Sequence, residues 1–149
     1  MAQMRWIDKV FSFFKQSPLG PYRNQSWDSL STSEKGDKGE RLALNYCKKA
    51  LGYRIVTKNW RHHRGEIDLI CLDQACLVFI EVRLRKAVSL VSGVQSISRK
   101  EKSLLRRTAI AYLNRLGKRP KTYRFDIISI AYGQSKDYKI SHYRNVALF

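Results

Sequence analysis

The sequence predicts an α/β fold in which helices flank a central mixed β-sheet. Apolar side chains recur at helical spacing over about residues 36–52 and 99–116, and a glycine ends each pattern. The stretches between and after these helices are rich in β-branched and aromatic residues, which is typical of strands. The elements follow in the order α-β-β-β-α-β-β, and this order favours a sheet with helices packed against it.

Local patterns define the individual elements. Asp37 is a candidate N-cap for the first helix, and a turn at Asp73-Gln74 joins the second strand to the third. A basic loop over 86–98, which contains Gly93, precedes the second helix. That helix should turn inward Leu105, Ala109, Tyr112, Leu113 and Leu116. Strands are predicted over 53–60, 66–72, 76–85, 123–132 and 138–149, the last as one strand or a pair.

The first 35 residues are expected to be an extension of a domain that spans residues 36–149. Apolar spacing over about 3–15 predicts an amphipathic helix, and the Pro-, Gly- and Ser-rich stretch over 17–33 is typical of a linker. A helix docked on the domain or on a partner is favoured over a membrane-surface helix, because its polar face carries few basic residues.

The chain is strongly basic, with 29 Lys+Arg against 12 Asp+Glu and a formal net charge of +17. Such a charge favours binding to phosphate-rich polymers or anionic membranes and says nothing about fold. Because the basic residues are spread through patterned segments rather than gathered in a tail, nucleic acid is the favoured partner. Acidic proteins are the alternative.

The cysteines and the hydropathy indicate a location. Cys47, Cys71 and Cys76 are odd in number and lack CxxC spacing, which favours a reduced compartment and no structural zinc. No apolar run approaches the roughly 18 residues that span a bilayer. Asp8 and Lys9 interrupt the apolar N-terminus, unlike a secretory signal. We therefore expect a cytoplasmic protein without a transmembrane segment.

Three of the few carboxylates lie inside two strongly apolar strands: Glu66 and Asp68 in the second, Glu81 in the third. Alternation predicts that Glu66 and Asp68 share one face of their strand and that Glu81 and Arg83 share a face of theirs. A loop over 73–76 would pair Asp68 with Glu81, whereas a two-residue loop would pair Glu66 with Glu81. The opposite faces would hold Ile67, Leu69 and Cys71 on the second strand and Val78, Ile80 and Val82 on the third.

Carboxylates that converge in this way indicate a divalent cation, because their mutual repulsion is tolerated when a cation binds between them. Hard oxygen ligands in small number suit Mg²⁺ or Mn²⁺. The alternative is that each acid pairs with a neighbouring arginine. Glu40 is a further candidate, although the dipole of the first helix alone would explain an acid in its first turn. Asp126, which follows Arg124, is expected to form a structural ion pair.

Four short motifs occur together in this chain: Gly39-Glu40-Arg41 with Ala43; Asn59-Trp60-Arg61 leading into Gly65-Glu66-Ile67-Asp68-Leu69-Ile70; Val78-Phe79-Ile80-Glu81-Val82-Arg83-Leu84-Arg85; and Arg124-Phe125-Asp126. In combination they resemble the YraN family of uncharacterised bacterial proteins. That family is similar to Holliday-junction resolvases of archaea and to PD-(D/E)XK nucleases. Over about residues 36–149, the resemblance implies a three-layer restriction-endonuclease-like fold. It also implies metal ligation by Glu40, Asp68 and Glu81, with Glu66 beside them.

The family pattern is Glu-X-Lys, and Arg83 occupies the lysine position. Arginine contacts phosphate but stays protonated, so it does not act as a base. Activity would then depend on metal-bound water alone, recruit Lys100 or Lys102, or be lost. The catalytic group expected from the resemblance consists of Asp68, Glu81, Arg83 and Glu66.

Two basic clusters are expected to bind nucleic acid. Residues 99–121 hold nine basic side chains against one acid, Glu101, and a second basic cluster at 61–64 precedes the acidic motif. A solvated helix face usually mixes charge signs, and this one does not. The candidate contacts are Arg61, Arg64, Arg85, Arg99, Lys100, Lys102 and Arg106.

These features predict a Mg²⁺- or Mn²⁺-dependent endonuclease that acts on DNA, with branched or damaged structures as candidate substrates. The alternative is a catalytically weak or inactive nucleic-acid-binding module of the same fold. An adaptor on anionic lipid ranks below both. The resemblance to resolvases also suggests a homodimer.

Overall fold

The computed structural model describes residues 22, 24–88 and 97–148. The helix predicted over 3–15 and Gly93 lie outside the described residues. The elements are the 3-10 helix η2 (Trp27–Ser29), α1 (Thr32–Lys49), β1 (Arg54–His62), β2 (Gly65–Asp73), β3 (Cys76–Lys86), α2 (Arg99–Arg115), β4 (Thr122–Tyr132) and β5 (Tyr138–Tyr143). The predicted order of helices and strands is confirmed, and residues 138–149 contribute one strand.

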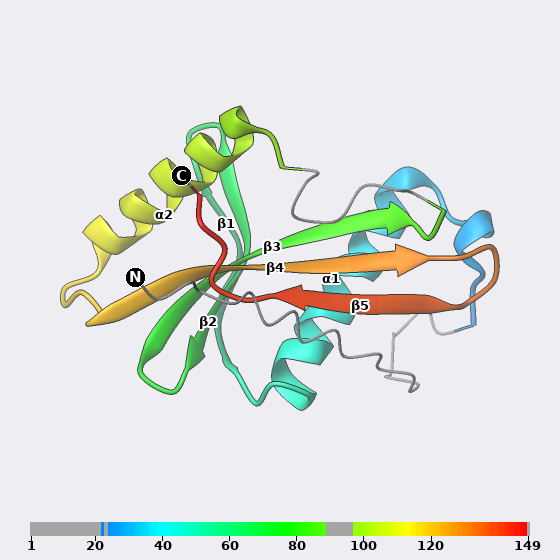
Figure 1. The fold of residues 1–149 in the computed structure, drawn as a ribbon, viewed down its shortest axis with the longest axis horizontal. Coiled ribbons are helices and arrows are strands. Elements are labelled where there is room, and N and C mark those ends of the chain that lie inside the picture. The colour runs from blue at the N-terminus through cyan, green and yellow to red at the C-terminus, as the bar shows by residue number, and fades with distance from the viewer. Residues whose placement is uncertain (1–21, 23, 89–96, 149) are drawn as a thin grey trace, which may run out of the picture.

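The five strands form one mixed sheet in the order β1-β2-β3-β4-β5 (Figure 1). Neighbouring strands are antiparallel except β3 and β4, which are parallel. Parallel neighbours need a crossover connection, and α2 lies between them in the sequence. The fold is therefore α/β with a central mixed sheet, as predicted.

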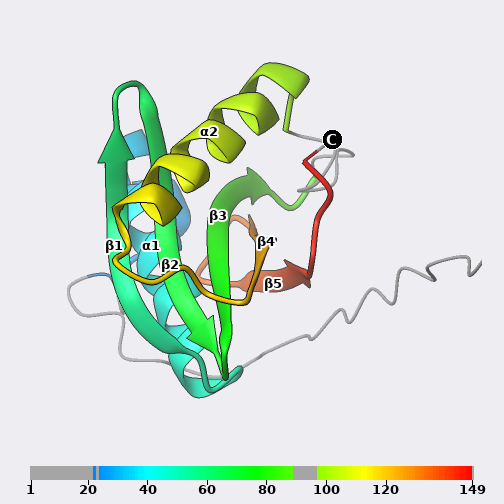
Figure 2. The same cartoon turned by 90° about the vertical axis from the view of Figure 1, so that its left-hand side faces the viewer.

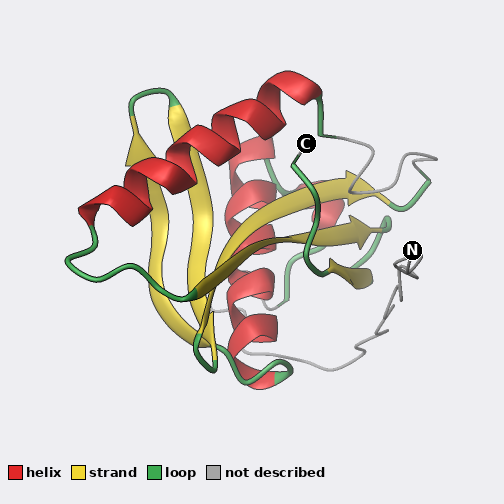
Figure 3. Cartoon of the chain, turned by 60° about the vertical axis from the view of Figure 1, so that its left-hand side comes forward, coloured by secondary structure: helices red, strands yellow, loops and turns green. Residues whose placement is uncertain are grey.

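The two helices cover opposite faces of the sheet, which gives three layers (Figure 2). Figure 3 shows α1 behind the strands and α2 in front of the β1–β2 hairpin. Leu42, Ala43 and Cys47 of α1 pack in one apolar cluster, and Ala109 and Leu113 of α2 pack in another. The strands are thus buried from both sides, which explains why β2 and β3 are apolar along most of their length.

The start of the first helix differs from the prediction. α1 begins at Thr32, because Ser31 caps it and Glu34 completes a capping box. Asp37 lies inside the helix and pairs with Arg41, so its assignment as the N-cap is wrong. Trp27 is fully buried in the core, so the described part of the predicted linker belongs to the packed domain. Sequence patterning missed this segment because one tryptophan anchors a polar stretch.

Gly65 brings the β1–β2 hairpin into close contact with α2. A Cβ atom at this position would overlap the Oγ1 atom of Thr108. Thr108 is itself buried and donates its hydroxyl to the carbonyl oxygen of Leu104 at 2.7 Å. Only glycine lets the strand approach the helix at this distance, which fixes the start of the strand that carries Glu66 and Asp68.

None of the helices in the described ranges is both long and apolar enough to cross a membrane.

Candidate metal and phosphate site

The candidate site lies where β2 and β3 separate. The two strands pair from Asp73↔Cys76 to Leu69↔Ile80, whereas β3 continues beside β4 as far as Lys86. Continued by one residue, this register would set Asp68 opposite Glu81, but the strands separate before that pair forms. The register excludes a pairing of Glu66 with Glu81. The physical reason is that the chain turns between Asp73 and Cys76 rather than one residue earlier.

Asp68 fills the opening between the separating strands. Its Oδ2 atom accepts a hydrogen bond from the backbone N–H of Val82 at 2.7 Å. The carboxylate therefore takes the place that a carbonyl oxygen of β2 would have in a continuous ladder. Burial raises the pKa of Asp68 to about 6 against the opposing effect of the Val82 N–H, and the charges of Glu40 and Glu66 raise it further.

Side-chain alternation along β2 is interrupted at Asp68. Ile67 packs in the cluster under α2, whereas Leu69 and Cys71 pack in the cluster under α1. The prediction that these three residues share a face is therefore wrong for Ile67. The physical reason is that Asp68 turns toward β3, after which the strand resumes with its faces exchanged.

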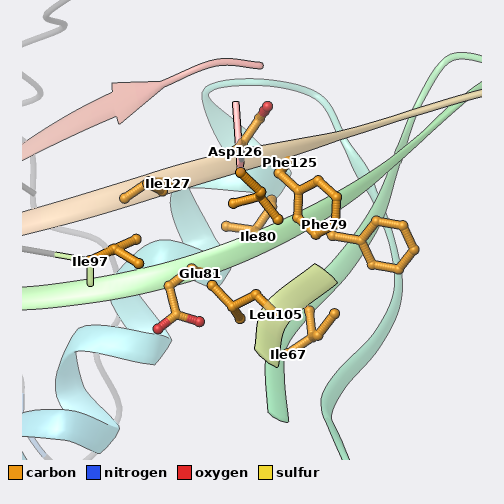
Figure 4. A pocket seen from close by; sticks show the side chains of 10 residues that line it. Ile67, Phe79, Ile80, Glu81, Ile97, Leu105, Phe125, Asp126 and Ile127 are labelled. Atoms are coloured by element: carbon orange, nitrogen blue, oxygen red, sulfur yellow. The ribbon is translucent and has the colours of Figure 1, made fainter. Parts of the chain in front are cut away.

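Glu81 projects from β3 toward α2, into a pocket whose walls are mainly apolar (Figure 4). Its side chain is 18% exposed, and Ile97 and Leu105 lie beside it. Burial, followed by the charge of Asp68, raises the pKa of Glu81 to about 8. A buried carboxyl group with this pKa needs a proton or a cation at neutral pH.

Arg83 shares this face with Glu81, as predicted, and contacts two carboxylates. Its Nη2 atom lies 2.8 Å from Oε1 of Glu101 in the first turn of α2. Its Nε atom lies 3.4 Å from Oε1 of Glu81, yet this buried atom has no hydrogen-bond partner with acceptable geometry. The guanidinium group therefore supplies the positive charge beside Glu81 without saturating its own donors.

Glu40 reaches the site from α1, on the far side of the sheet from Glu81. Because α1 begins at Thr32, Glu40 lies in the middle of the helix, so the helix dipole does not explain an acid at this position. Its Oε2 atom accepts a hydrogen bond from Nδ2 of Asn59 on β1 at 3.0 Å. Its charge raises the pKa of Asp68. Glu40 is therefore held beside Asn59, which stands opposite Asp68 in the β1–β2 register.

Glu66 lies next to this group but is held by another partner. It stands opposite Arg61 on β1, and the two side chains form an exposed ion pair at 3.1 Å. An exposed pair of this kind contributes at most about 1 kcal/mol. Because the charge of Glu66 raises the pKa of both Asp68 and Glu81, it acts on the site mainly through its field.

Asp68 and Glu81 form an interacting pair of carboxylates, and Glu40 is their neighbour rather than a third member of one cluster. Within the described ranges, no three His, Cys, Asp or Glu side chains are grouped closely enough to hold a metal ion. If a hard divalent cation binds here, Asp68 and Glu81 are the residues that would hold it, because both are carboxylates and their charges act on each other. Two protein oxygens with water in the remaining positions are usual for Mg²⁺.

The basic residues that were expected to bind nucleic acid lie on β1, in the β1–β2 turn, at the end of β3 and on α2. Arg64 lies in the β1–β2 turn, and Gly65, the next residue, lies against Thr108 near the middle of α2. Arg99 and Lys100 are exposed in the first turn of α2. Arg85 extends from the end of β3 and donates from Nε to Oγ of Ser129 at 3.3 Å. Lys102 and Arg106 lie further along α2, and Arg61 pairs with Glu66.

Asp126 belongs to a separate, structural network, as predicted. Its carboxylate has no exposed surface and accepts from Nε of Arg124 at 2.9 Å. It also bonds Nε2 of His142 and accepts from the backbone N–H of Asn145, both at 2.9 Å. Arg124 extends the network to Asp73 at 2.9 Å. The hydrogen bonds from His142, Arg124 and Asn145 hold the pKa of Asp126 below its ordinary value despite burial, which by itself raises it.

Sequence reasoning missed two contacts of the candidate site: the hydrogen bond from Asn59 to Glu40 and the ion pair of Glu101 with Arg83. Asn59 carried a signal, because asparagine is depleted in strands and yet stands in the middle of β1. Glu101 carried one too, as the only acid among nine basic residues. The hydrogen bond from the backbone N–H of Val82 to Asp68 could not be predicted, because a backbone donor has no signal in the sequence.

Comparison with known proteins places this architecture in a family. Residues 39–130 match an uncharacterised protein family, UPF0102, a range that includes Glu40, Asp68, Glu81 and Arg83. The chain belongs to UPF0102. The predicted resemblance to a family of uncharacterised bacterial proteins is thereby confirmed.

UPF0102 relatives cover most of this chain. A UPF0102 protein of Chlorobaculum parvum is 39% identical over 109 residues, which is 72% of this chain and 83% of the relative. A relative from Alkaliphilus oremlandii is 37% identical over 112 residues, 74% of this chain and 94% of its own length. A third, from Dichelobacter nodosus, is 39% identical over 117 residues, 78% of this chain and 91% of the relative.

Proposed function

We propose that this UPF0102 protein is a metal-dependent endonuclease that hydrolyses DNA phosphodiester bonds. The observation that carries the proposal is the buried pair Asp68 and Glu81 at the opening between β2 and β3, beside the cation Arg83. An acidic site within a chain of net charge +17 suits a cation that faces a polyanion. Branched or damaged DNA is the proposed substrate class.

Each residue has a proposed task. Asp68 and Glu81 hold Mg²⁺ or Mn²⁺, and Glu40 supports them from the α1 side. The bound ion would supply a lowered water pKa and stabilisation of charge on the phosphate. Arg83 contacts the scissile phosphate, because its planar fork matches phosphate oxygens. The basic residues of the β1–β2 turn and of α2 hold the DNA backbone above the carboxylates.

The direct test compares purified wild-type protein with Asp68→Ala/Glu81→Ala on branched and linear DNA, with Mg²⁺ or Mn²⁺. We expect the wild type to cut and the double variant to bind without cutting. Asp28→Ala/Asp137→Ala is the matched control, because it removes the same charge at exposed positions outside the site. If the wild-type protein binds DNA but cuts no substrate with either metal, the proposed endonuclease activity is refuted.

The alternative is a nucleic-acid-binding module with weak or no catalysis, and Arg83 favours it. Its guanidinium group is engaged by Glu81 and Glu101 and stays protonated. Arg83→Lys distinguishes the two functions. If arginine limits the reaction, the lysine variant cuts faster than the wild type, whereas a pure binding module stays inactive with either residue.

DNA binding itself is tested by its salt dependence. Arg99→Ala/Lys100→Ala should lower the slope of log affinity against log salt by about 2, because each side chain neutralises one phosphate in the proposed complex. Lys48→Ala/Lys49→Ala removes the same charge from the C-terminal end of α1, which Figure 1 shows at the opposite end of the molecule. Equal slopes for the two variants would contradict the proposed face. Light scattering of the same samples would test the proposed homodimer.

A further inference from the structure

Asn59 has an unusual backbone conformation at the edge of the candidate site. It lies in the middle of β1, yet its φ angle is +50°, in the left-handed region that non-glycine residues rarely adopt. The register pairs Lys58 with Leu69 and Trp60 with Ile67, which places Asn59 opposite Asp68. A strained residue inside a strand persists only where its surroundings hold it, and such strain is concentrated at functional sites.

The Asn59 side chain is directed at the one candidate ligand that comes from a helix. Its Nδ2 atom donates to Oε2 of Glu40 at 3.0 Å. The helix comes close to the sheet at this point, because a Cβ atom on Gly39 would lie 3.4 Å from Cδ1 of Leu84. Glu40 is thus brought down onto the sheet by α1 and is held from the side by β1.

The carboxylate of Glu40 would otherwise turn away from Asp68. Glu40 contacts Asn59, which stands opposite Asp68 in the strand register, so the two acids lie near each other and their like charges repel. Glutamate has a flexible side chain with several free torsions, so repulsion alone would direct its carboxylate toward solvent. An amide donor holds the carboxylate in place without neutralising the charge that a cation needs.

We infer that Asn59 is a positioning residue that holds Glu40 beside Asp68 for a divalent cation. The inference rests on the proposed function, since it assigns a role within the same site. Asparagine suits the task twice over: it tolerates the left-handed backbone better than other residues with a side chain, and its amide reaches the helix.

The experiment measures Mn²⁺ affinity by titration calorimetry on the full chain without DNA. Asn59→Gly removes the amide and tolerates the positive φ angle, so the strand conformation is kept. Asn145→Gly is the matched control, because Asn145 also has a positive φ angle, +55°, and lies outside the site. We expect Asn59→Gly to weaken Mn²⁺ binding by about 10- to 100-fold, as is usual when a residue that orients a ligand is lost, and Asn145→Gly to leave it unchanged.

A double-mutant cycle with Glu40→Ala separates positioning from a general structural effect. If Asn59 acts through Glu40, Asn59→Gly has little further effect once Glu40 is alanine. Wild-type affinity in Asn59→Gly, or additive losses in the cycle, would overturn the inference and leave the Asp68–Glu81 site intact. Absence of Mn²⁺ binding by the wild-type chain would instead reject the proposed metal site and, with it, the role of Asn59.

Discussion

The Nη2 atom of Arg83 on β3 lies 2.8 Å from Oε1 of Glu101 in the first turn of α2. Glu101 also accepts from the backbone N–H of Ser98 at 2.8 Å, which completes the capping box of that helix. One carboxylate therefore begins the helix and anchors the arginine of the candidate site. The position of the basic first turn of α2 is thus coupled to the site.

Replacing Glu101 should change the titration of Glu81 without disrupting α2. Gln serves in a capping box as well as Glu, so Glu101→Gln keeps the helix start. The negative charge of Glu101 raises the pKa of Glu81. In the glutamine variant that charge is gone, and the positive charge of Arg83 then acts mainly on Glu81. We expect the Glu81 pKa to fall, as measured by NMR of the side-chain carboxyl carbon. The control is Glu34→Gln, in the equivalent capping box of α1, and an equal shift in both variants would contradict the coupling.

The metal-free protein should lose stability as pH rises from about 5 to about 8. The folded-state pKa values of Asp68 and Glu81, about 6 and about 8, lie above the ordinary values of 3.8 and 4.5. The folded state then binds more protons than the unfolded state across this window, so the free energy of unfolding falls with pH. The lowered pKa values of Glu101 and Asp126 act only at more acidic pH.

Glu81→Gln isolates this contribution. The variant should be more stable than the wild type at pH 8 by on the order of 4 kcal/mol and should show a flatter pH profile. Urea denaturation at several pH values in a chelating buffer measures it, with Asp28→Asn as an exposed control. A profile as steep as that of the wild type would show that Glu81 is already ionised in the folded protein at low pH.

Gly65→Ala should destabilise the fold by about 1–3 kcal/mol or more, because the new methyl group overlaps Oγ1 of Thr108. Thr108→Ala in the same chain removes that oxygen and should recover part of the loss. Gly36→Ala is the control, since nothing lies within 4 Å of a Cβ atom there and alanine favours a helix. Thermal denaturation tests all three variants, and an unchanged midpoint in Gly65→Ala would contradict the close approach.

Asp126→Asn should destabilise the protein by about 3–5 kcal/mol, since it removes the fully buried carboxylate charge that Arg124 and His142 share and leaves Arg124 with its more exposed partner, Asp73. Mn²⁺ affinity of the folded fraction should not change, because Asp126 lies in a network outside the candidate site. Asp73→Asn breaks the more exposed part of the same network and should cost less. A selective loss of Mn²⁺ affinity in Asp126→Asn would place this residue at the metal instead.

Local patterns in the sequence predicted most of the fold. Helical spacing located α2 to within one residue, and apolar runs located all five strands. The start of α1 was missed because the pattern was taken from apolar residues, whereas the capping box of Ser31 and Glu34 is polar. The packing of Trp27 was missed for a related reason, since a single aromatic residue has no periodicity.

The candidate site was predicted only in part. Carboxylates in apolar strands identified Asp68 and Glu81, because an acid in such a position requires an explanation wherever the strand lies. The sequence did not indicate that Glu66 is engaged by Arg61 or that Arg83 is held by Glu101. Those pairings depend on which residues become neighbours in space.

By itself, the sequence determined the layered α/β fold, the strand of each acid and the excess of positive charge. These properties follow from spacing and composition, which are local. Only the tertiary structure decided that β3 leaves β2 after Ile80, that Asp68 turns into the opening, and that Asn59 bonds Glu40. These relations join segments far apart in the chain, so they arise from strand twist and helix packing that no local pattern encodes.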